Sequence, residues 1–446
     1  MKKVIFLLLF FLCSFLCLEF SIGYAIQLDL KTCIQMGLKY NPKLKADLYT
    51  ELSRSEDIKT ALINLLLPDM SINRSHQKLM SVGSSGAVNE DYLDQTSDLT
   101  SFDISKDILS LFSNLSEYHR AKLEKKIAEY QKRLTTIELI KDISTTFYNI
   151  LKVDEDIKSL NDAIVHLRVN FDYAKALFNK RLISYTDVLN AKVDLEDVKQ
   201  KLSIEKNKKN YFTNFLKTLI GLSPDEKITL RYKKPKAYTF EKSYEECLSY
   251  AFKHRPEISI LEFRRKIYED ERKTWLSRIL PSLRVGINYN EYSRDYAELG
   301  RSMFGYYDRD FDISYWNSYV SMKWELNSLP RNFFQIKRTK FVIKAIDKRI
   351  EDSKNTIRNE VRTYYLSVKE ALKRITTTKI ALKAAEENYK QAEEKFRLLI
   401  GSISEVLEAQ ERLTRARANY SQAILDFQIS LANLKYAMGI RKGEIP

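Results

Sequence analysis

The residue types that carry most enzyme chemistry are few in this chain of 446 residues, and they stand apart from one another. No histidine has a second histidine at helical ligand spacing, and no cysteine pair lies near one, so the pattern of a zinc site is missing. The sequence also has no glycine-rich phosphate loop and no Gly-x-Ser-x-Gly nucleophile motif. We therefore predict that the chain is not an enzyme, has no catalytic or metal-binding residues and needs no cofactor. The isolated histidines, interpreted as surface or packed residues, are His76, His119, His166 and His254.

The N-terminus predicts export. Two lysines precede an apolar run that Glu19 interrupts, and small residues follow at the two positions that determine cleavage, Gly23 and Ala25. This is the pattern of a secretory signal peptide, which we assign to residues 1–25. A permanent membrane anchor, the alternative, needs roughly 20 apolar residues, more than this run contains. Lipidation of a cysteine in the run is disfavoured, because a bulky leucine precedes each one.

The net charge of +15 is compatible with a nucleic acid or an acidic surface as partner. However, the basic residues are scattered among acidic ones, so we interpret them as solvated helix faces and predict no nucleic-acid partner. No segment after the signal peptide is a run of about 20 apolar residues, so no membrane helix is predicted. The remaining cysteines, Cys33 and Cys247, are expected to be small buried residues on helices; a disulfide is permitted but not indicated.

The mature sequence contains an internal duplication. We predict a first repeat over residues 26–230 and a second over 231–446, each in the order helix, two strands, long helical hairpin. The residues that recur at one constant offset are Phe178, Val188, Leu189, Ala191, Leu195, Leu216, Lys217 and Gly221, which return as Phe396, Val406, Leu407, Ala409, Leu413, Leu434, Lys435 and Gly439.

Each repeat is expected to begin with a helix that ends at a proline, Pro68 or Pro281. An alternating strand such as Trp316–Leu326 then has about the length of a tilted membrane strand, roughly 9–11 residues. A sheet of a soluble sandwich, the alternative, alternates in the same way. Two strands per repeat leave open edges that lipid does not tolerate, so membrane insertion requires oligomerisation. We expect lipid contact at Trp316, Val320, Met322 and Trp324, and a lumen face at Asn317, Ser321 and Lys323.

The first strand, Met70–Lys78, fits this pattern poorly, because Arg74, His76 and Lys78 join its less polar face. Either this strand enters the membrane only briefly, or its register differs from the one read here.

Very long helices follow the strands. No glycine or proline occurs between Gly86 and Gly221, or between Pro330 and Gly401, and apolar residues recur in steps of four and three, the seam of a coiled coil. A helix over about 110–181 would span roughly 105 Å. The return over 187–221 covers half of that length, so a second helix over 244–279 is expected to stack end to end with it.

This doubled order of motifs resembles the outer-membrane efflux protein family, the TolC-like export channels. The stretches Phe178–Ala191 and Phe396–Ala409 look like that family's periplasmic hairpin tips, and Asn41-Pro42 and Leu67-Pro68 match its pattern. The resemblance implies an α+β membrane protein and a homotrimer. Four strands from each protomer would close one transmembrane β-barrel of twelve strands, continued by a long coiled-coil α-helical barrel. It also implies a periplasmic adaptor (membrane fusion) protein, an inner-membrane transporter and outer-membrane lipid as partners.

We therefore predict a passive outer-membrane channel, the exit duct of a tripartite efflux or type I secretion system, that extends into the periplasm. A structural coiled-coil tether of the envelope is the first alternative; it would explain the helices but not the amphipathic strands. An exported enzyme is the second, and only the size of the chain favours it. The exported substrate, whether a drug, a metal ion or a polypeptide, cannot be read from the sequence.

The resemblance further implies two functional sites at the hairpin tips. The tips would dock the adaptor, although apolar residues there could instead staple the turn. Acidic residues just inside the tips would ring a narrow periplasmic mouth, although Asp187 and Glu405 have the spacing of capping boxes. Glu408 lies one turn further along, where capping does not explain it. The tip residues are Leu182, Ile183, Ser184, Leu399, Ile400, Gly401 and Ser402, and the constriction residues are Asp187, Glu405 and Glu408.

Overall fold

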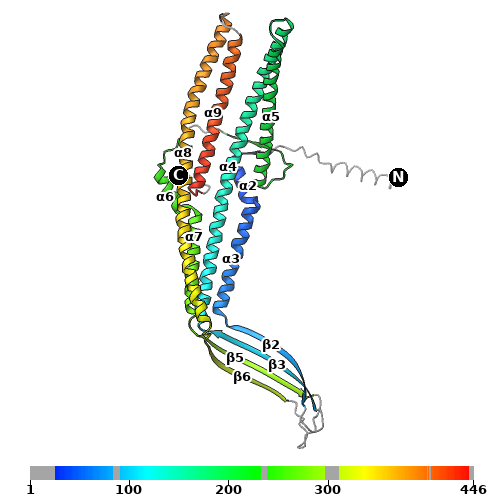
Figure 1. Ribbon diagram of the computed structural model, residues 1–446, viewed down its shortest axis with the longest axis vertical. Helices are drawn as coiled ribbons and strands as arrows, with labels where there is room; N and C mark the ends of the chain where they lie inside the picture. Colours follow the sequence, from blue (N-terminus) through cyan, green and yellow to red (C-terminus); the bar gives the residue numbers. More distant parts are fainter. Residues whose placement is uncertain are drawn as a thin grey trace, which may run out of the picture. The chain divides into compact units, whose positions relative to one another are not determined.

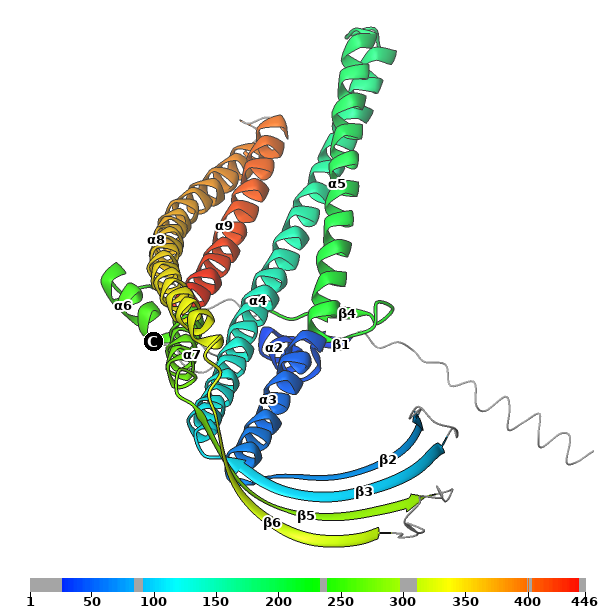
Figure 2. The same cartoon turned by 60° about the horizontal axis from the view of Figure 1, so that its bottom comes forward.

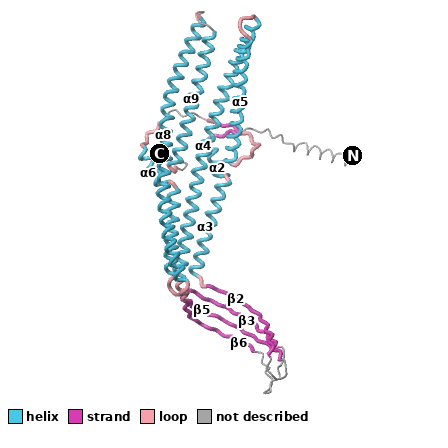
Figure 3. The backbone as a smooth tube through the Cα atoms, in the orientation of Figure 1, coloured by secondary structure: helices cyan, strands magenta, loops and turns pink. Residues whose placement is uncertain are grey.

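The computed structural model describes residues 26–83, 91–232, 239–296, 311–398, 400 and 403–440; the predicted signal peptide lies outside them. One order of elements, two helices, two strands and a hairpin of one long and one shorter helix, occurs twice in the described chain (Figures 1 and 3). The first set is α2 (Leu30–Tyr40), α3 (Pro42–Leu66), β2 (Asp69–Gly83), β3 (Asp91–Asp107), α4 (Ser110–Asn179) and α5 (Tyr185–Ile220). The second set is α6 (Tyr244–His254), α7 (Pro256–Ser277), β5 (Ser282–Tyr296), β6 (Phe311–Lys323), α8 (Ser328–Arg397) and α9 (Ile403–Ala437).

The chain forms two compact units, and each unit takes segments from both predicted repeats. The helical unit comprises the described parts of 1–47, 132–256 and 354–446, and the sheet unit comprises those of 48–131 and 257–353. In the helical unit, β1 (Ile26–Leu28) and β4 (Ile228–Leu230) form a short parallel pair that the sequence did not indicate. None of the helices in the described ranges is long and apolar enough to span a membrane.

Each helix predicted before a strand pair is two helices in the structure, which corrects the sequence prediction. The breaks fall at Asn41-Pro42 and Arg255-Pro256. Proline disfavours helical geometry in the residue before it, and Asn41 and Arg255 are accordingly extended, with ψ of 124° and 121°. Proline is well tolerated as the first residue of the next helix, because its missing N–H has no partner at that position.

The α2–α3 break lies against the end of α5, and the α6–α7 break lies against the end of α9. The expectation that the helix over 244–279 stacks with the return over 187–221 was therefore wrong, since each return meets the helices of its own repeat. Gly221 after α5 and Gly439 after α9 are both left-handed, with φ of 75° and 71°. A Cβ at Gly221 would lie 2.7 Å from Cβ of Tyr40, and one at Gly439 would lie 3.0 Å from the carbonyl oxygen of His254. Glycine is therefore required at both junctions for two reasons, the backbone angle and the close approach.

Different side chains complete the two junctions. Asn41 Nδ2 donates to the carbonyl of Leu219, 3.1 Å away. The guanidinium of Arg255 donates to the carbonyl of Tyr436 at 3.3 Å and to Glu360 Oε2 at 2.9 Å. The first junction thus has a neutral hydrogen bond where the second has an ion pair with a buried arginine.

The main core of the helical unit lies where α2, α4 and α5 meet. Cys33, Phe147 and Leu216 are fully buried in it. Burial raises the pKa of the Cys33 thiol to about 12, so this thiol is protonated at neutral pH and is unreactive. Cys247 is also buried and free, which confirms the expectation for both cysteines.

The four long strands of the sheet unit form one antiparallel sheet in the order β2-β3-β5-β6, and the strands curve together (Figure 2). The register aligns one apolar face across all four strands and one polar face on the other side. The apolar face holds Met70, Ile72, Phe102, Ile104, Val285, Ile287, Tyr289, Trp316, Val320 and Met322. The polar face holds Ser71, Asn73, Ser101, Asp103, Ser105, Arg284, Asn288, Asn290, Asn317 and Ser321.

The last strand starts and ends earlier than predicted, since β6 spans Phe311–Lys323. Trp324 already lies beyond it, where its indole N–H donates to the carbonyl of Ile279 at 3.2 Å. This bond ties the end of β6 to the turn before β5. The strand ends at Lys323 because its partner β5 begins at Ser282, opposite Lys323.

The first strand of the sheet, β2, which fitted the alternating pattern poorly, has the register that its sequence predicted. Arg74, His76 and Lys78 share the face of Met70 and Ile72. They stand opposite polar partners on β3: Thr100, Asp98 and Thr96. His76 Nδ1 lies 2.7 Å from Asp98 Oδ1. The apolar part of this face is therefore confined to the half of the sheet nearer the helices.

Candidate functional site

The turn between α4 and α5 is held by a complete helix-end motif. Arg181 is left-handed, with φ of 60°. The N–H of Leu182 donates to the carbonyl of Leu177 at 3.0 Å, and that of Arg181 to the carbonyl of Phe178 at 2.8 Å. These two bonds form a Schellman motif, in which glycine is the usual left-handed residue. At this turn an arginine adopts the left-handed conformation instead, which costs a residue with a side chain roughly 1–2 kcal/mol.

Ser184 begins α5 through a capping box. The backbone N–H of Ser184 donates to Asp187 Oδ2 at 3.0 Å, and that of Asp187 donates to Ser184 Oγ at 3.3 Å. The structure thus places Asp187 in the capping role that was the alternative to a constriction. Of the predicted tip residues here, Leu182 is 66% exposed and Ile183 is half-buried.

The turn between α8 and α9 shares one feature with the first. The N–H of Ile400 donates to the carbonyl of Lys395 at 3.0 Å, so Ile400 occupies the position of Leu182. Ile400 is 74% exposed. The two hairpins of the helical unit turn at the same end of that unit (Figure 1). The predicted tip residues Leu399, Gly401 and Ser402 lie outside the described residues.

The acidic residues of α9 differ in their surroundings. Glu405 is exposed in the first turn of the helix. Glu408 is exposed and forms an ion pair with Arg412, with Oε2 and Nη2 3.6 Å apart. Arg412 is a residue that sequence reasoning missed; its spacing of four from Glu408 on one helix was the available signal.

The polar face of the sheet contains a contact that the sequence did not indicate. Tyr319 Oη donates to Asp103 Oδ2 at 3.0 Å, so the ring reaches from β6 across β5 to β3. It crosses above Gly286, where a Cβ would lie 2.6 Å from Cζ of Tyr319. Gly286 therefore makes room for a polar link across three strands.

Polar contacts also join the two hairpins within the helical unit. Asp426 on α9 lies 2.7 Å from Lys152 Nζ on α4 and 3.1 Å from Arg374 Nη1 on α8. Gln422 on α9 donates to Asp156 on α4. Burial, and then the nearby Glu205 carboxylate, raise the pKa of Asp156. Among the residues that the structure describes, no group of three or more His, Cys, Asp or Glu side chains is arranged to hold a metal ion.

The described chain thus combines an amphipathic four-stranded sheet with two long helical hairpins. Residues 247–440 match the family model described as outer membrane efflux protein. The chain is 24% identical over 348 residues to outer membrane protein TolC of Vibrio cholerae, a match that covers 75% of this chain and 77% of the relative.

Solved structures share the fold. The Campylobacter jejuni CmeC outer membrane channel has a TM-score of 0.75 at 14% identity, with 93% of this chain and 87% of that chain covered. The open state of the Neisseria gonorrhoeae MtrE outer membrane channel has a TM-score of 0.71 at 16% identity, with 92% and 89% covered.

These matches confirm the resemblance predicted from the sequence: the chain is similar to TolC-like outer-membrane efflux proteins. They also confirm the predicted location in the outer membrane. The relatives are named as channels and outer-membrane proteins, in agreement with the prediction that the chain is not an enzyme.

Proposed function

We propose that this chain is the passive exit duct of a tripartite efflux or type I secretion system. Three copies would close a barrel of twelve strands, and the helices would continue the tunnel across the periplasm. The observation that carries this proposal is the sheet: one face is apolar across all four strands, and Ile72, Trp316 and Val320 on it are 75%, 67% and 70% exposed. Within the described chain, β2 and β6 each pair on one side only, so closure requires other copies.

Bilayer recordings with two neighbouring lysine variants test this function. The wild-type chain should form ion-conducting pores in a planar bilayer. Val320→Lys, on the apolar face, should reduce pore insertion, because a lysine near the bilayer midplane costs roughly 2–4 kcal/mol. Ser321→Lys, one residue further and on the polar face, should insert normally and alter conductance. A chain that folds but never conducts would favour the envelope tether.

The hairpin ends are proposed to dock the periplasmic adaptor. Leu182 and Ile400 occupy equivalent positions in their turns and remain 66% and 74% exposed, so the turns do not bury them. Exposed apolar side chains at matched positions suit a docking surface better than a staple. Cysteines at these two positions should cross-link to the adaptor in whole cells; labelling by buffer reagents alone would argue against docking.

The proposed constriction depends most on Glu408, because Asp187 is engaged in a capping box. Glu408→Gln should weaken cation selectivity, since three carboxylates around a narrow axis attract cations. Arg412→Gln should strengthen cation selectivity, because it removes the positive charge that pairs with each Glu408. Reversal potentials of single channels in a salt gradient measure both effects. Unchanged selectivity in the Glu405/Glu408 double glutamine variant would exclude this constriction.

A further inference from the structure

A basic groove lies between α4 and α7 in the sheet unit, with α3 beside it. Its volume is about 610 Å³. Five lysines line it, namely Lys122, Lys125, Lys126, Lys266 and Lys273. Neither the proposed channel nor its partners account for this concentration of one charge.

The carboxylates that line the groove are already paired. Glu129 lies 3.9 Å from Lys125 Nζ, and Asp270 lies 2.8 Å from Lys273 Nζ. Glu269 pairs with Arg265 at 2.7 Å. Two of the five lysines are therefore matched by acids, and the third acid is matched by a residue outside the lining.

The other three lysines contact aromatic rings rather than acids. Lys122 Nζ lies 4.2 Å from the ring centroid of Tyr118. Lys126 Nζ and Lys266 Nζ lie 5.6 and 5.8 Å from the ring of Phe263. A ring contact at an exposed site is worth only about 0.5–1 kcal/mol and leaves the charge of the ammonium group uncompensated. Three positive charges thus remain available to an anion.

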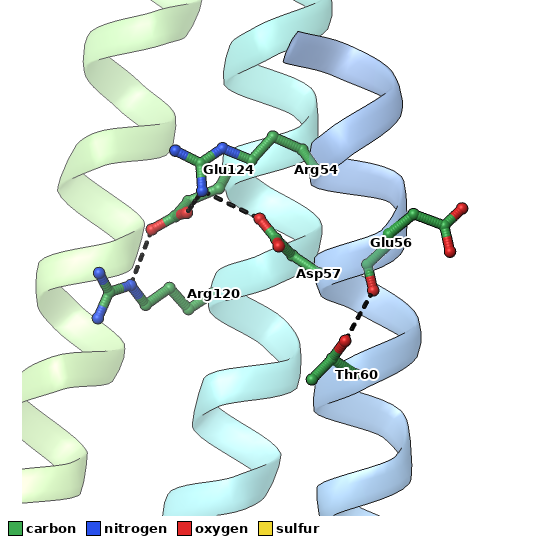
Figure 4. Close-up of polar contacts among 6 residues, drawn as sticks. All are labelled: Arg54, Glu56, Asp57, Thr60, Arg120 and Glu124. Atoms are coloured by element: carbon green, nitrogen blue, oxygen red, sulfur yellow. Dashed lines mark hydrogen bonds and ion pairs between the residues drawn. The ribbon is translucent and has the colours of Figure 1, made fainter. Parts of the chain in front are cut away.

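The neighbouring arginines show the contrast. Glu124 on α4 accepts a hydrogen bond from Arg120 Nε at 2.8 Å and pairs with Arg54 of α3 at 3.1 Å, as Figure 4 shows. Arg54 also pairs with Asp57 at 3.0 Å. Each of these arginines is paired with a carboxylate. The unpaired positive charge is therefore a feature of the groove and not of this stretch of α3 and α4 in general.

The face of α4 that carries these lysines becomes apolar nearer the sheet. Residues 112, 115, 119, 122 and 126 follow helical spacing along one face. Phe112 and Leu115 on this face are 60% and 43% exposed. The equivalent face of α7 runs from Lys266 through Lys273 to Leu276, which is 47% exposed. Both helices thus present charge and then apolar surface as they approach the strands.

Since the sheet is proposed to span the outer membrane, we infer that this groove binds the phosphate-bearing headgroup of an anionic phospholipid at the periplasmic surface. The ammonium groups of Lys122, Lys126 and Lys266 contact the phosphate, and the acyl chains lie against Phe112 and Leu115. The order of charge and apolar surface along α4 and α7 matches the order of headgroup and acyl chain in the inner leaflet. A lysine near an anionic membrane surface contributes about 1 kcal/mol, so three together give strong preference for charged lipid.

Native mass spectrometry of the full chain, released from bilayers of phosphatidylglycerol and phosphatidylcholine, tests this inference. The wild-type chain should retain phosphatidylglycerol in preference to phosphatidylcholine. The triple variant Lys122→Gln/Lys126→Gln/Lys266→Gln should retain at least about tenfold less of it. The matched control Lys379→Gln/Lys383→Gln/Lys390→Gln removes the same charge from exposed positions on α8 within the helical unit and should retain the wild-type amount.

Further arms separate the ways in which this inference could fail. The arginine triple variant at Lys122, Lys126 and Lys266 keeps the charge and should keep the lipid; its loss would overturn the electrostatic assignment. Displacement of the lipid by millimolar inorganic phosphate would identify free phosphate as the ligand instead. Conductance is recorded in the same bilayers. If the pores are normal and the wild type and the glutamine variant retain equal amounts of lipid, lipid binding in the groove is overturned and the channel function is not. If the wild type forms no pores, the proposed function itself is overturned.

Discussion

Replacing Arg255 with leucine should open the junction between α6 and α7 and speed amide exchange there by about 100-fold. Arg255 is only 4% exposed, and its guanidinium contacts Glu360 and the carbonyl of Tyr436. Leucine removes these hydrogen bonds, so the carbonyl of Tyr436 keeps the N–H of Gly439 at 2.8 Å but loses the guanidinium that ties it to the α6–α7 junction. Losing one partner of a largely buried ion pair typically costs about 3 kcal/mol or more. Hydrogen exchange of the full chain in detergent, read at the last turn of α9, measures this opening.

Two controls identify the cause of that opening. Arg264→Leu removes a charge from an exposed position on α7 and should leave exchange unchanged. Asn41→Ala removes two neutral bonds at the corresponding junction of the first repeat, one to the carbonyl of Leu219 and one from the N–H of Leu44, and the cost should be smaller, about 2 kcal/mol. An Arg255 variant that exchanges no faster than the Arg264 variant would show that the ion pair does not hold the junction.

Gly221→Val should destabilise the other junction by about 3 kcal/mol. A left-handed φ of 75° costs a side chain about 1–2 kcal/mol, and valine is among the residues least suited to it. Its Cβ would also lie 2.7 Å from Cβ and 3.4 Å from the backbone of Tyr40, the last residue of α2, so the end of that helix would have to shift. Overpacking of this kind adds about 1–3 kcal/mol. The urea midpoint of the full chain in detergent, followed by circular dichroism, should fall.

Ser223→Val introduces the same side chain two residues later at an exposed position and should change stability by less than about 0.5 kcal/mol. Equal midpoints for the two variants would mean that the Gly221 turn rearranges without cost. Gly439→Val should behave like Gly221→Val, because Gly439 has the same conformation and approaches His254 and Arg255 as closely.

Local patterns predicted most of the secondary structure, because each depends on neighbours in the sequence. The alternation around Val320 in the last strand and around Arg74 in the first identified which residues share a face of their strands. The long stretches without glycine or proline predicted α4 and α8, which contain 70 residues each. The prolines at Asn41-Pro42 and Arg255-Pro256 were also visible in the sequence, but each helix was expected to end only at Pro68 or Pro281.

Contacts between distant residues needed the tertiary structure. That β3 of the first repeat pairs with β5 of the second depends on register and long-range packing, which a strand's own alternation does not encode. The capping role of Asp187 could be foreseen from spacing, but whether the side chain adopts it depends on the geometry of the turn.

The sequence by itself determined the class of elements, the doubled order and the resemblance to outer-membrane efflux proteins, since periodicity, prolines and glycines act within a few residues. The tertiary structure alone decided which charges are matched. Asp426 between Lys152 and Arg374, and the unmatched lysines between α4 and α7, illustrate this. The physical reason is that an ion pair depends on distances of a few ångströms between side chains, and for partners on different helices the packing of those helices sets these distances.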